Sequence, residues 1–218
     1  MLFEIGTGRY EPPPNTEDKN VLTVWENDLT KVREESAAIK KVRENTEAGE
    51  KSHTQIQGWL RDLGISLGYD VWIASNDRSR PYRDGKLSDN CLEKLPLSGG
   101  AEFEVIKLID VLWLAKGTST VTAAFEVEHT TSIYSGVLRL YDLALSELGA
   151  SLKGIYLVAP DERQEDVKRQ LQRPAFQKIA DLKVRFLSYS EFEKNREAMA
   201  KFGEGLKAIE AIAKLLVA

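Results

Sequence analysis

The spacing of hydrophobic residues changes several times along the chain, and each change predicts a separate element. Between positions 52 and 67 apolar side chains recur every three or four residues, which predicts a helix capped by Ser52 and ended by Gly68. Short apolar runs predict strands over residues 69–75, 103–115, 121–130, 153–160 and 183–190. The second and third of these runs flank the turn sequence KGTS, so we expect them to pair as a hairpin.

Helical spacing returns over residues 132–148, 161–180 and 191–218, with a break near Gly203–Gly205. Residues 76–101 are polar and rich in turn-forming residues, which predicts a loop. The order helix, strand, hairpin, helix, strand, helix, strand, helix is typical of an α/β core. In such a core we expect a mixed β-sheet flanked by helices.

The N-terminal part of the chain has a different character. Residues 1–20 include the sequence EPPPNTEDKN, which predicts a loop or an extended lead-in. Residues 21–51 have helical spacing but are highly charged, with only a thin apolar stripe. This segment is an arm, a partner-facing helix, a linker or simply a solvated face. We therefore expect a helical N-terminal extension over residues 1–51 and a globular domain over residues 52–218.

Composition excludes several classes of protein. The chain has 218 residues and a net charge of −4. It is therefore not a bulk polycation, and any surface for nucleic acid must be a local basic patch. The single cysteine, Cys91, excludes an intrachain disulfide and a multi-cysteine zinc site. No signal peptide and no bilayer-length apolar run is visible, so we expect a cytoplasmic protein without a membrane partner.

Acidic residues interrupt the apolar hairpin. Alternate side chains of a strand share a face, so Glu126 and Glu128 point the same way, about 7 Å apart. A turn centred near Thr118 brings Asp110 opposite Glu126. Three close carboxylates repel one another unless a cation lies among them, and carboxylate and backbone oxygens suit Mg²⁺ or Mn²⁺. Taken singly, each acid has another interpretation, as a strand cap or a solvated acid on an edge hairpin.

These residues resemble the motif of the PD-(D/E)xK nuclease superfamily, in which an acid, a hairpin turn and a strand ending in Glu-x-Lys or Glu-x-Glu follow one another. The matching elements are LIDVLWL and AAFEVEH, and the resemblance covers roughly residues 52–190, most like restriction-endonuclease domains. It implies a restriction-endonuclease-like core in which Asp110, Glu126 and the backbone of Val127 hold the metal. Glu128 takes the place usually occupied by lysine, and would act as a general base or an additional ligand.

Neighbouring side chains are further candidates for the same site. Superfamily members often carry an acid or glutamine on the helix before the first strand, where His53 and Gln57 lie one turn apart. Gln57 either holds a water of the metal or lies on a solvated helix face. His129 points to the opposite side of its strand. It is more typical of a core histidine, or of one that contacts the site residues but not the metal. Arg139 forms a structural ion pair, pairs with a site carboxylate or binds a phosphate.

Candidate contacts to a DNA backbone lie on the loop after the first strand and at the start of the helix predicted over residues 132–148. The sequence NDRSRPYRDGK supplies Arg78, Arg80 and Arg83 and follows the first strand, near the expected site. The hydroxyls of Thr130 and Ser132 either cap the next helix or touch phosphate.

The resemblance implies a metal-dependent endonuclease that hydrolyses DNA phosphodiester bonds in restriction, defence or DNA processing. Its catalytic set would be Asp110, Glu126, Glu128 and Gln57. The replaced lysine and the negative net charge favour a second hypothesis, a nuclease-fold module that binds nucleic acid or protein without catalysis. A third is an α/β interaction domain with structural carboxylates. For an endonuclease we expect double-stranded DNA as the partner, and cutting both strands in one binding event predicts a homodimer.

Overall fold

The computed structural model describes residues 3–5, 9–11, 49, 52–97, 101–129, 133–173 and 183–216. The chain divides into two compact units, residues 1–48 and 49–218. In the first unit, β1 (Phe3–Ile5) pairs antiparallel with β2 (Arg9–Glu11). The sequence predicted a loop or extended lead-in here and missed this pairing. The predicted charged helix over residues 21–51 falls almost wholly outside the described residues.

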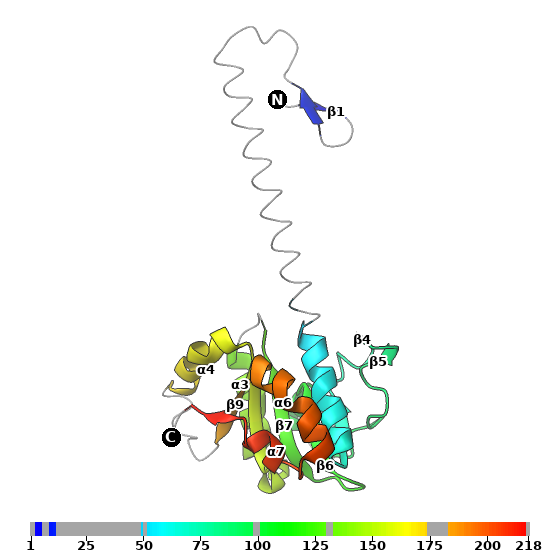
Figure 1. The fold of residues 1–218 in the computed structure, drawn as a ribbon, viewed down its shortest axis with the longest axis vertical. Coiled ribbons are helices and arrows are strands. Elements are labelled where there is room, and N and C mark those ends of the chain that lie inside the picture. Colours follow the sequence, from blue (N-terminus) through cyan, green and yellow to red (C-terminus); the bar gives the residue numbers. More distant parts are fainter. Residues whose placement is uncertain are drawn as a thin grey trace. The chain divides into compact units, whose positions relative to one another are not determined.

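The second unit is built on a six-stranded mixed sheet (Figure 1). In spatial order its strands are β10 (Lys214–Leu215), β9 (Val184–Ser188), β8 (Gly154–Ala159), β7 (Val121–Val127), β6 (Val111–Ala115) and β3 (Tyr69–Ile73). The strands β7, β8 and β9 run parallel, and the other neighbours pair antiparallel. A separate small ribbon consists of β4 (Pro81–Tyr82) and β5 (Gly85–Lys86).

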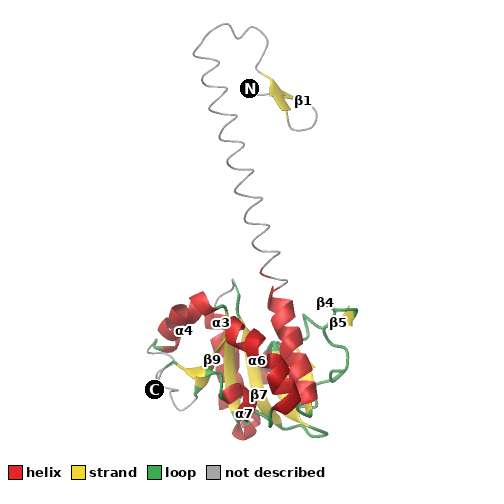
Figure 2. Cartoon of the chain, viewed as in Figure 1, coloured by secondary structure: helices red, strands yellow, loops and turns green. Residues whose placement is uncertain are grey.

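Helices cover both faces of this sheet (Figure 2). One face packs against α2 (Ala101–Ile106), α3 (Ile133–Leu145) and α4 (Gln164–Leu171). The other packs against the helix over residues 52–66, α6 (Tyr189–Phe202) and α7 (Lys207–Glu210). Two 3₁₀ helices, η1 (Glu147–Ser151) and η2 (Asp161–Arg163), flank β8. A mixed sheet flanked by helices confirms the predicted fold class and is consistent with a restriction-endonuclease-like core.

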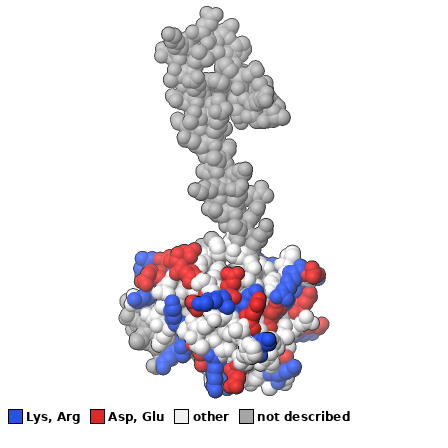
Figure 3. Space-filling model, in the orientation of Figure 1, with Lys and Arg blue, Asp and Glu red and all other residues white. Residues whose placement is uncertain are grey.

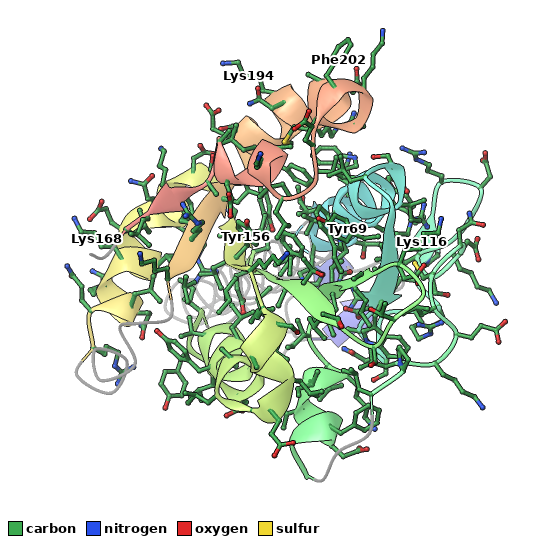
Figure 4. The ribbon with its side chains drawn as sticks, turned by 90° about the horizontal axis from the view of Figure 1, so that it is seen from below. Tyr69, Lys116, Tyr156, Lys168, Lys194 and Phe202 are labelled. Atoms are coloured by element: carbon green, nitrogen blue, oxygen red, sulfur yellow. The ribbon has the colours of Figure 1, made fainter. Side chains whose placement is uncertain are left out.

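The central strand β7 is buried along its whole length. Aromatic rings cross the sheet beside it: Tyr69 stacks on Trp113 with ring centroids 5.2 Å apart, and Trp113 lies 4.7 Å from Phe125. Phe125 in turn stacks on Tyr156 at 4.9 Å. Figure 4 labels Tyr69 and Tyr156, the two ends of this row. Because cross-strand ring pairs stabilise a register, the residues at the end of β7 take defined positions.

Two predicted elements were wrong. Residues 103–106 belong to α2 rather than to a strand, because Phe103 and Ile106, one helical turn apart, both pack into the core beside α3. The strand β6 begins only at Val111. The predicted helix over residues 191–218 also ends early, since the chain after α7 pairs with β9 as β10. That pairing makes β10 a short edge strand beside β9.

Helix boundaries agree with the prediction at some ends and not at others. Gly68, with a φ of 85°, ends the first helix as predicted. Position 52 is already helical, so Ser52 is not its N-cap. The stretch 161–180 forms η2 and α4, and residues 174–180 lie outside the described residues. None of the described helices is both long and apolar enough to cross a membrane.

Candidate active site

The start of β6 and the end of β7 lie side by side in the middle of the sheet. They lie at the edge that the carboxyl ends of the parallel strands form. Val111 pairs with Phe125 across the hairpin. One position further out, Asp110 therefore lies opposite Glu126, in the register that the sequence predicted. The exposed fraction of the residue is 6% at Asp110, 0% at Glu126 and 2% at Glu128. Carboxylates buried to this extent need compensating partners.

Asp110 accepts hydrogen bonds from the main chain and from the first helix of this unit. Its Oδ2 accepts the Val127 N–H at 2.7 Å and lies 3.3 Å from His53 Nε2, and its Oδ1 accepts from Gln57 Nε2 at 3.1 Å. Burial lowers the pKa of His53, but the hydrogen bond and charge of Asp110, with the charge of Asp77, raise that pKa above its ordinary value. Asp110 therefore ties the helix to the hairpin.

Gln57 is buried and links Asp77 to Asp110. The alternative prediction, that Gln57 lies on a solvated helix face, is wrong. Its side chain has no exposed surface, and its Nε2 donates to Asp77 Oδ2 at 2.8 Å as well as to Asp110. Asp77 lies in the loop after β3, is 2% exposed and pairs with Arg80 at 2.7 Å. The sequence analysis did not single out Asp77. Its position in the sequence, two residues after the predicted strand 69–75, is a signal that would have found it.

An arginine of α3 compensates the charge of Glu126. Arg139 Nε and Nη2 donate to the two carboxylate oxygens at 2.8 and 2.6 Å. Burial and then the charge of Asp110 raise the pKa of Glu126 well above its ordinary value, and Arg139 opposes that rise. Of the roles predicted for Arg139, the structure contains the ion pair with a site carboxylate. Its contact with a phosphate stays a prediction.

Glu128 lies on the same side of the sheet as Glu126, as strand alternation predicted. Its N–H donates to the Val158 carbonyl at 2.8 Å, which extends the pairing of β7 with β8. Both glutamates pack against Gly136 of α3, where an added Cβ would lie 2.5 Å from Glu128 Oε1 and 3.4 Å from Glu126 Cβ. Because Gly136 has no Cβ, the side chains of Glu126 and Glu128 can pack against the backbone of α3.

The buried acids of the described residues gather at this edge. Four acidic residues are buried among the described ones, and all of them gather here: Asp77, Asp110, Glu126 and Glu128. We call this group the acidic edge. It is not a ready three-ligand site, because no group of three His, Cys, Asp or Glu side chains in the described part of the chain is placed to hold a metal ion. Its donor chemistry nevertheless fits a hard cation, since Mg²⁺ binds through one or two carboxylates plus water and phosphate oxygens.

The predicted DNA-binding residues differ in their internal contacts. Arg78 lies over a tryptophan ring, with 4.6 Å to the ring centroid, and Arg80 pairs with the buried aspartate of the same loop. Arg83, at the turn between β4 and β5, pairs with Asp62 at 2.9 Å and keeps 62% of its side chain exposed. Thr130 and Ser132 lie outside the described residues. On the face drawn in Figure 3, basic and acidic side chains are interspersed.

Two rings complete the surroundings of the acidic edge. The His129 ring lies 6.2 Å from the ring of Tyr189, on the face of the sheet opposite the two glutamates. Tyr189 is the first residue of α6 and was not singled out from the sequence. The signal that would have found it is its place directly after β9, because the carboxyl ends of parallel strands share one edge.

Comparison with known proteins points to restriction enzymes. Residues 31–213 match the family described as the type II restriction enzyme NmeDI C-terminal domain. Over 151 residues, 66% of this chain, the sequence is 32% identical to the type II restriction enzyme NmeDI of Neisseria meningitidis serogroup C. The chain spans 42% of the length of that relative. No solved structure matches the chain.

Proposed function

The chain belongs to the family of the C-terminal domain of the type II restriction enzyme NmeDI, and from this premise we propose that it is a metal-dependent DNA endonuclease of a restriction system. Its core would be a PD-(D/E)xK domain with a Glu-x-Glu variant of the motif. The observation that carries the proposal is the acidic edge, where the buried acids of the described residues gather around the end of one hairpin.

A purely structural role explains this edge poorly. Burying a carboxylate destabilises a fold, and apolar residues of similar volume often replace buried ion pairs without loss of stability. Buried ionisable groups with shifted pKa values are, in contrast, typical of functional sites. Glu126 and His53 both have such shifts, and Asp110 contributes to each.

The metal would be held by Asp110, Glu126 and the backbone carbonyl of Val127. When bound, Mg²⁺ or Mn²⁺ supplies a Lewis acid for the phosphodiester and lowers the pKa of water. Gln57 fixes the Asp110 carboxylate through its Nε2, so that Asp110 keeps one orientation. The Val127 N–H holds the other oxygen of the same carboxylate.

Glu128 and Arg139 would take the remaining roles. Glu128 replaces the usual lysine and accepts the proton of the attacking water as a general base. Arg139, once released from Glu126, donates to a non-bridging oxygen of the phosphate, for which its planar guanidinium is suited. This requires DNA to approach from the side of α3.

We propose double-stranded DNA as the substrate and a homodimer as the cutting species. Among the arginines of the loop after β3, Arg83 is the best placed to contact DNA, because most of its side chain is exposed. Arg78 and Arg80 would support the loop through their internal contacts. Thr130 and Ser132 stay candidates for phosphate contacts.

The test is a comparison of Asp110→Asn with Asp84→Asn, a control at an exposed acid of the β4–β5 turn. We expect Asp110→Asn to abolish Mn²⁺ binding in calorimetry and to reduce Mg²⁺-dependent cleavage of long DNA by about 100-fold or more. The control should behave as the wild type in both assays. Unchanged cleavage by Asp110→Asn would refute the assignment of the site.

A second candidate function is a nuclease-fold module that binds DNA without cutting it. Two observations favour it: Glu126 forms an ion pair with Arg139, and no group of three ligand side chains among the described residues is placed to hold a metal ion. Salt-dependent DNA binding together with no cleavage in Mg²⁺ or Mn²⁺ would establish this alternative. Nicking of DNA by the wild type that requires a divalent metal would exclude it.

A further inference from the structure

Asp77 is the one member of the acidic edge without a part in the proposed chemistry. It lies in the loop after β3, is 2% exposed and pairs with Arg80. Replacing a buried ion pair by apolar residues of similar volume often costs a fold no stability. Stability alone therefore explains a buried acid at this place poorly.

Both carboxylate oxygens of Asp77 already face nitrogen atoms of the protein. Its Oδ1 lies 2.7 Å from Arg80 Nε, and its Oδ2 accepts a hydrogen bond from Gln57 Nε2 at 2.8 Å. Arg80 Nη1 also donates to the Thr54 hydroxyl at 3.3 Å, so the loop is held on the helix that carries Gln57. Asp77 is thus placed to orient a neighbouring side chain rather than to bind a cation itself.

The Gln57 amide connects Asp77 to Asp110. Its Nε2 donates to Asp77 Oδ2 at 2.8 Å and to Asp110 Oδ1 at 3.1 Å. Its Oε1 is buried and accepts no hydrogen bond from any described residue. The terminal torsion of a glutamine is broad, so hydrogen bonds have to fix the amide. Among the described residues only the two carboxylates do so, and the shorter of the two bonds goes to Asp77.

Only one orientation of the amide suits both acids. With Nε2 toward them each carboxylate meets an N–H donor, whereas a half-turn would place Oε1 against two negative charges. Asp77 therefore keeps a donor aimed at Asp110 Oδ1. The Val127 N–H holds the other oxygen of that carboxylate at 2.7 Å. Asp110 keeps a donor on each oxygen, and hence one orientation, as long as Gln57 keeps its own.

We propose that Asp77 is a positioning residue of the active site, which through Gln57 fixes the orientation of the Asp110 carboxylate. This inference rests on the proposed function, in which Asp110 is a metal ligand. Asp77 itself touches neither the metal nor the DNA. Loss of a group that orients a metal ligand typically weakens metal affinity or activity by about 10- to 100-fold.

The experiment measures Mn²⁺ binding by calorimetry in the full chain with Asp77→Ala, Asp77→Asn and the control Asp62→Asn. Asp62 matches Asp77 because it also pairs with an arginine, Arg83, and accepts a hydrogen bond from Tyr82, so it ties the same helix to the β4–β5 ribbon. We expect Asp77→Ala to bind Mn²⁺ about tenfold more weakly. Asp77→Asn keeps an acceptor oxygen for Gln57 and should recover most of this affinity. Asp62→Asn should bind as the wild type does, whereas wild-type affinity of Asp77→Ala overturns the inference.

A double variant tests whether Asp77 acts through Gln57. If it does, adding Asp77→Ala to Gln57→Leu costs no further Mn²⁺ affinity, because the side chain that connects Asp77 to Asp110 is already gone. A further tenfold loss in the double variant would mean that Asp77 acts on the metal by another route. That result overturns the positioning role.

Nuclear magnetic resonance supplies a measurement that needs neither metal nor cleavage. The Val127 amide proton reports on Asp110, because Asp110 Oδ2 accepts it. We expect its signal to shift in Asp77→Ala and to stay in place in Asp62→Asn. An unchanged signal in Asp77→Ala overturns the inference. If the wild type binds no Mn²⁺ and cuts no DNA, the proposed function fails, and the Val127 signal still decides whether Asp77 fixes Asp110.

Discussion

Arg139 and the buried carboxylate of Glu126 form a two-point ion pair, with Nε and Nη2 of the arginine 2.8 and 2.6 Å from the two oxygens. The side chain of Glu126 has no exposed surface, whereas that of Arg139 keeps 27%. The guanidinium therefore neutralises the carboxylate that a metal ion would use. A divalent cation that binds at Glu126 would therefore have to compete with Arg139.

Arg139→Met is expected to destabilise the fold by about 3 kcal/mol, because it leaves a buried carboxylate without its partner. Urea unfolding measures this effect. The double variant Arg139→Met, Glu126→Gln should recover most of the loss, since it removes the unpaired charge. Mn²⁺ should stabilise Arg139→Met more than the wild type if it binds at Glu126. Equal stabilisation of both proteins would contradict the competition.

The pKa of His53 should lie above its ordinary value and should fall in Asp110→Asn, because Asp110 supplies the hydrogen bond and charge that raise it. Proton NMR of the imidazole signals measures this directly, and the chain has 2 histidines, so His129→Gln assigns them. A His53 pKa that is unchanged in Asp110→Asn would contradict the contact.

The same shift has a consequence for stability. Because the folded pKa of His53 lies above 6.5, the folded protein binds more protons than the unfolded chain above that pH. The contribution of His53 to the free energy of unfolding is therefore fully present below pH 6.5 and is lost as the pH rises through the folded pKa. His53→Gln should reduce this part of the pH dependence in urea unfolding.

Gly136→Ala should alter the site more than the fold. The new Cβ would lie 2.5 Å from Glu128 Oε1, the far end of a flexible side chain that is able to move. Alanine also favours a helix by about 1 kcal/mol over glycine, which offsets part of the crowding. We expect a change in unfolding free energy below about 1 kcal/mol with slower DNA cleavage. Gly64→Ala, whose Cβ would meet the Trp113 indole at 2.4 Å, should destabilise the fold clearly.

Gln57→Leu should destabilise the protein by about 2 kcal/mol, because it removes the donor that Asp77 and Asp110 share. The matched control is Gln55→Leu, an exposed position on the same helix, where we expect little change. Thermal or urea unfolding distinguishes the two. If both variants lose equal stability, the bridge does not contribute.

The hairpin and its register were predictable because they depend on local chemistry. The turn sequence KGTS lies between two apolar runs, and side-chain alternation then assigns Glu126 and Glu128 to one face. The observed pairing of Val111 with Phe125 agrees with that register. In contrast, residues 103–106 are too few to show a period, and the apolar run that follows them is typical of a strand. In the structure Phe103 and Ile106 pack in the core one helical turn apart, and contact with α3 selected the helix.

The partners of the buried acids were harder to predict, since they come from distant parts of the chain. Gln57 and Asp110 are separated by 53 residues, and their contact exists only because the first helix packs on the hairpin. Asp77 joins them from a loop that sequence patterns describe only as polar. Tyr189 arrives at the same edge because β9 lies two strands from β7.

The sequence by itself determined the α/β class, the hairpin and the acids that it carries, because periodicity and turn chemistry act over a few residues. The tertiary structure decided how each acid is compensated: Asp110 by the main chain and Gln57, and Glu126 by Arg139. It also decided which buried polar atoms are left without a hydrogen bond, the Tyr189 hydroxyl among them. The physical reason is that the stability of a buried charge depends on donors that only the packing of distant segments brings within hydrogen-bond distance.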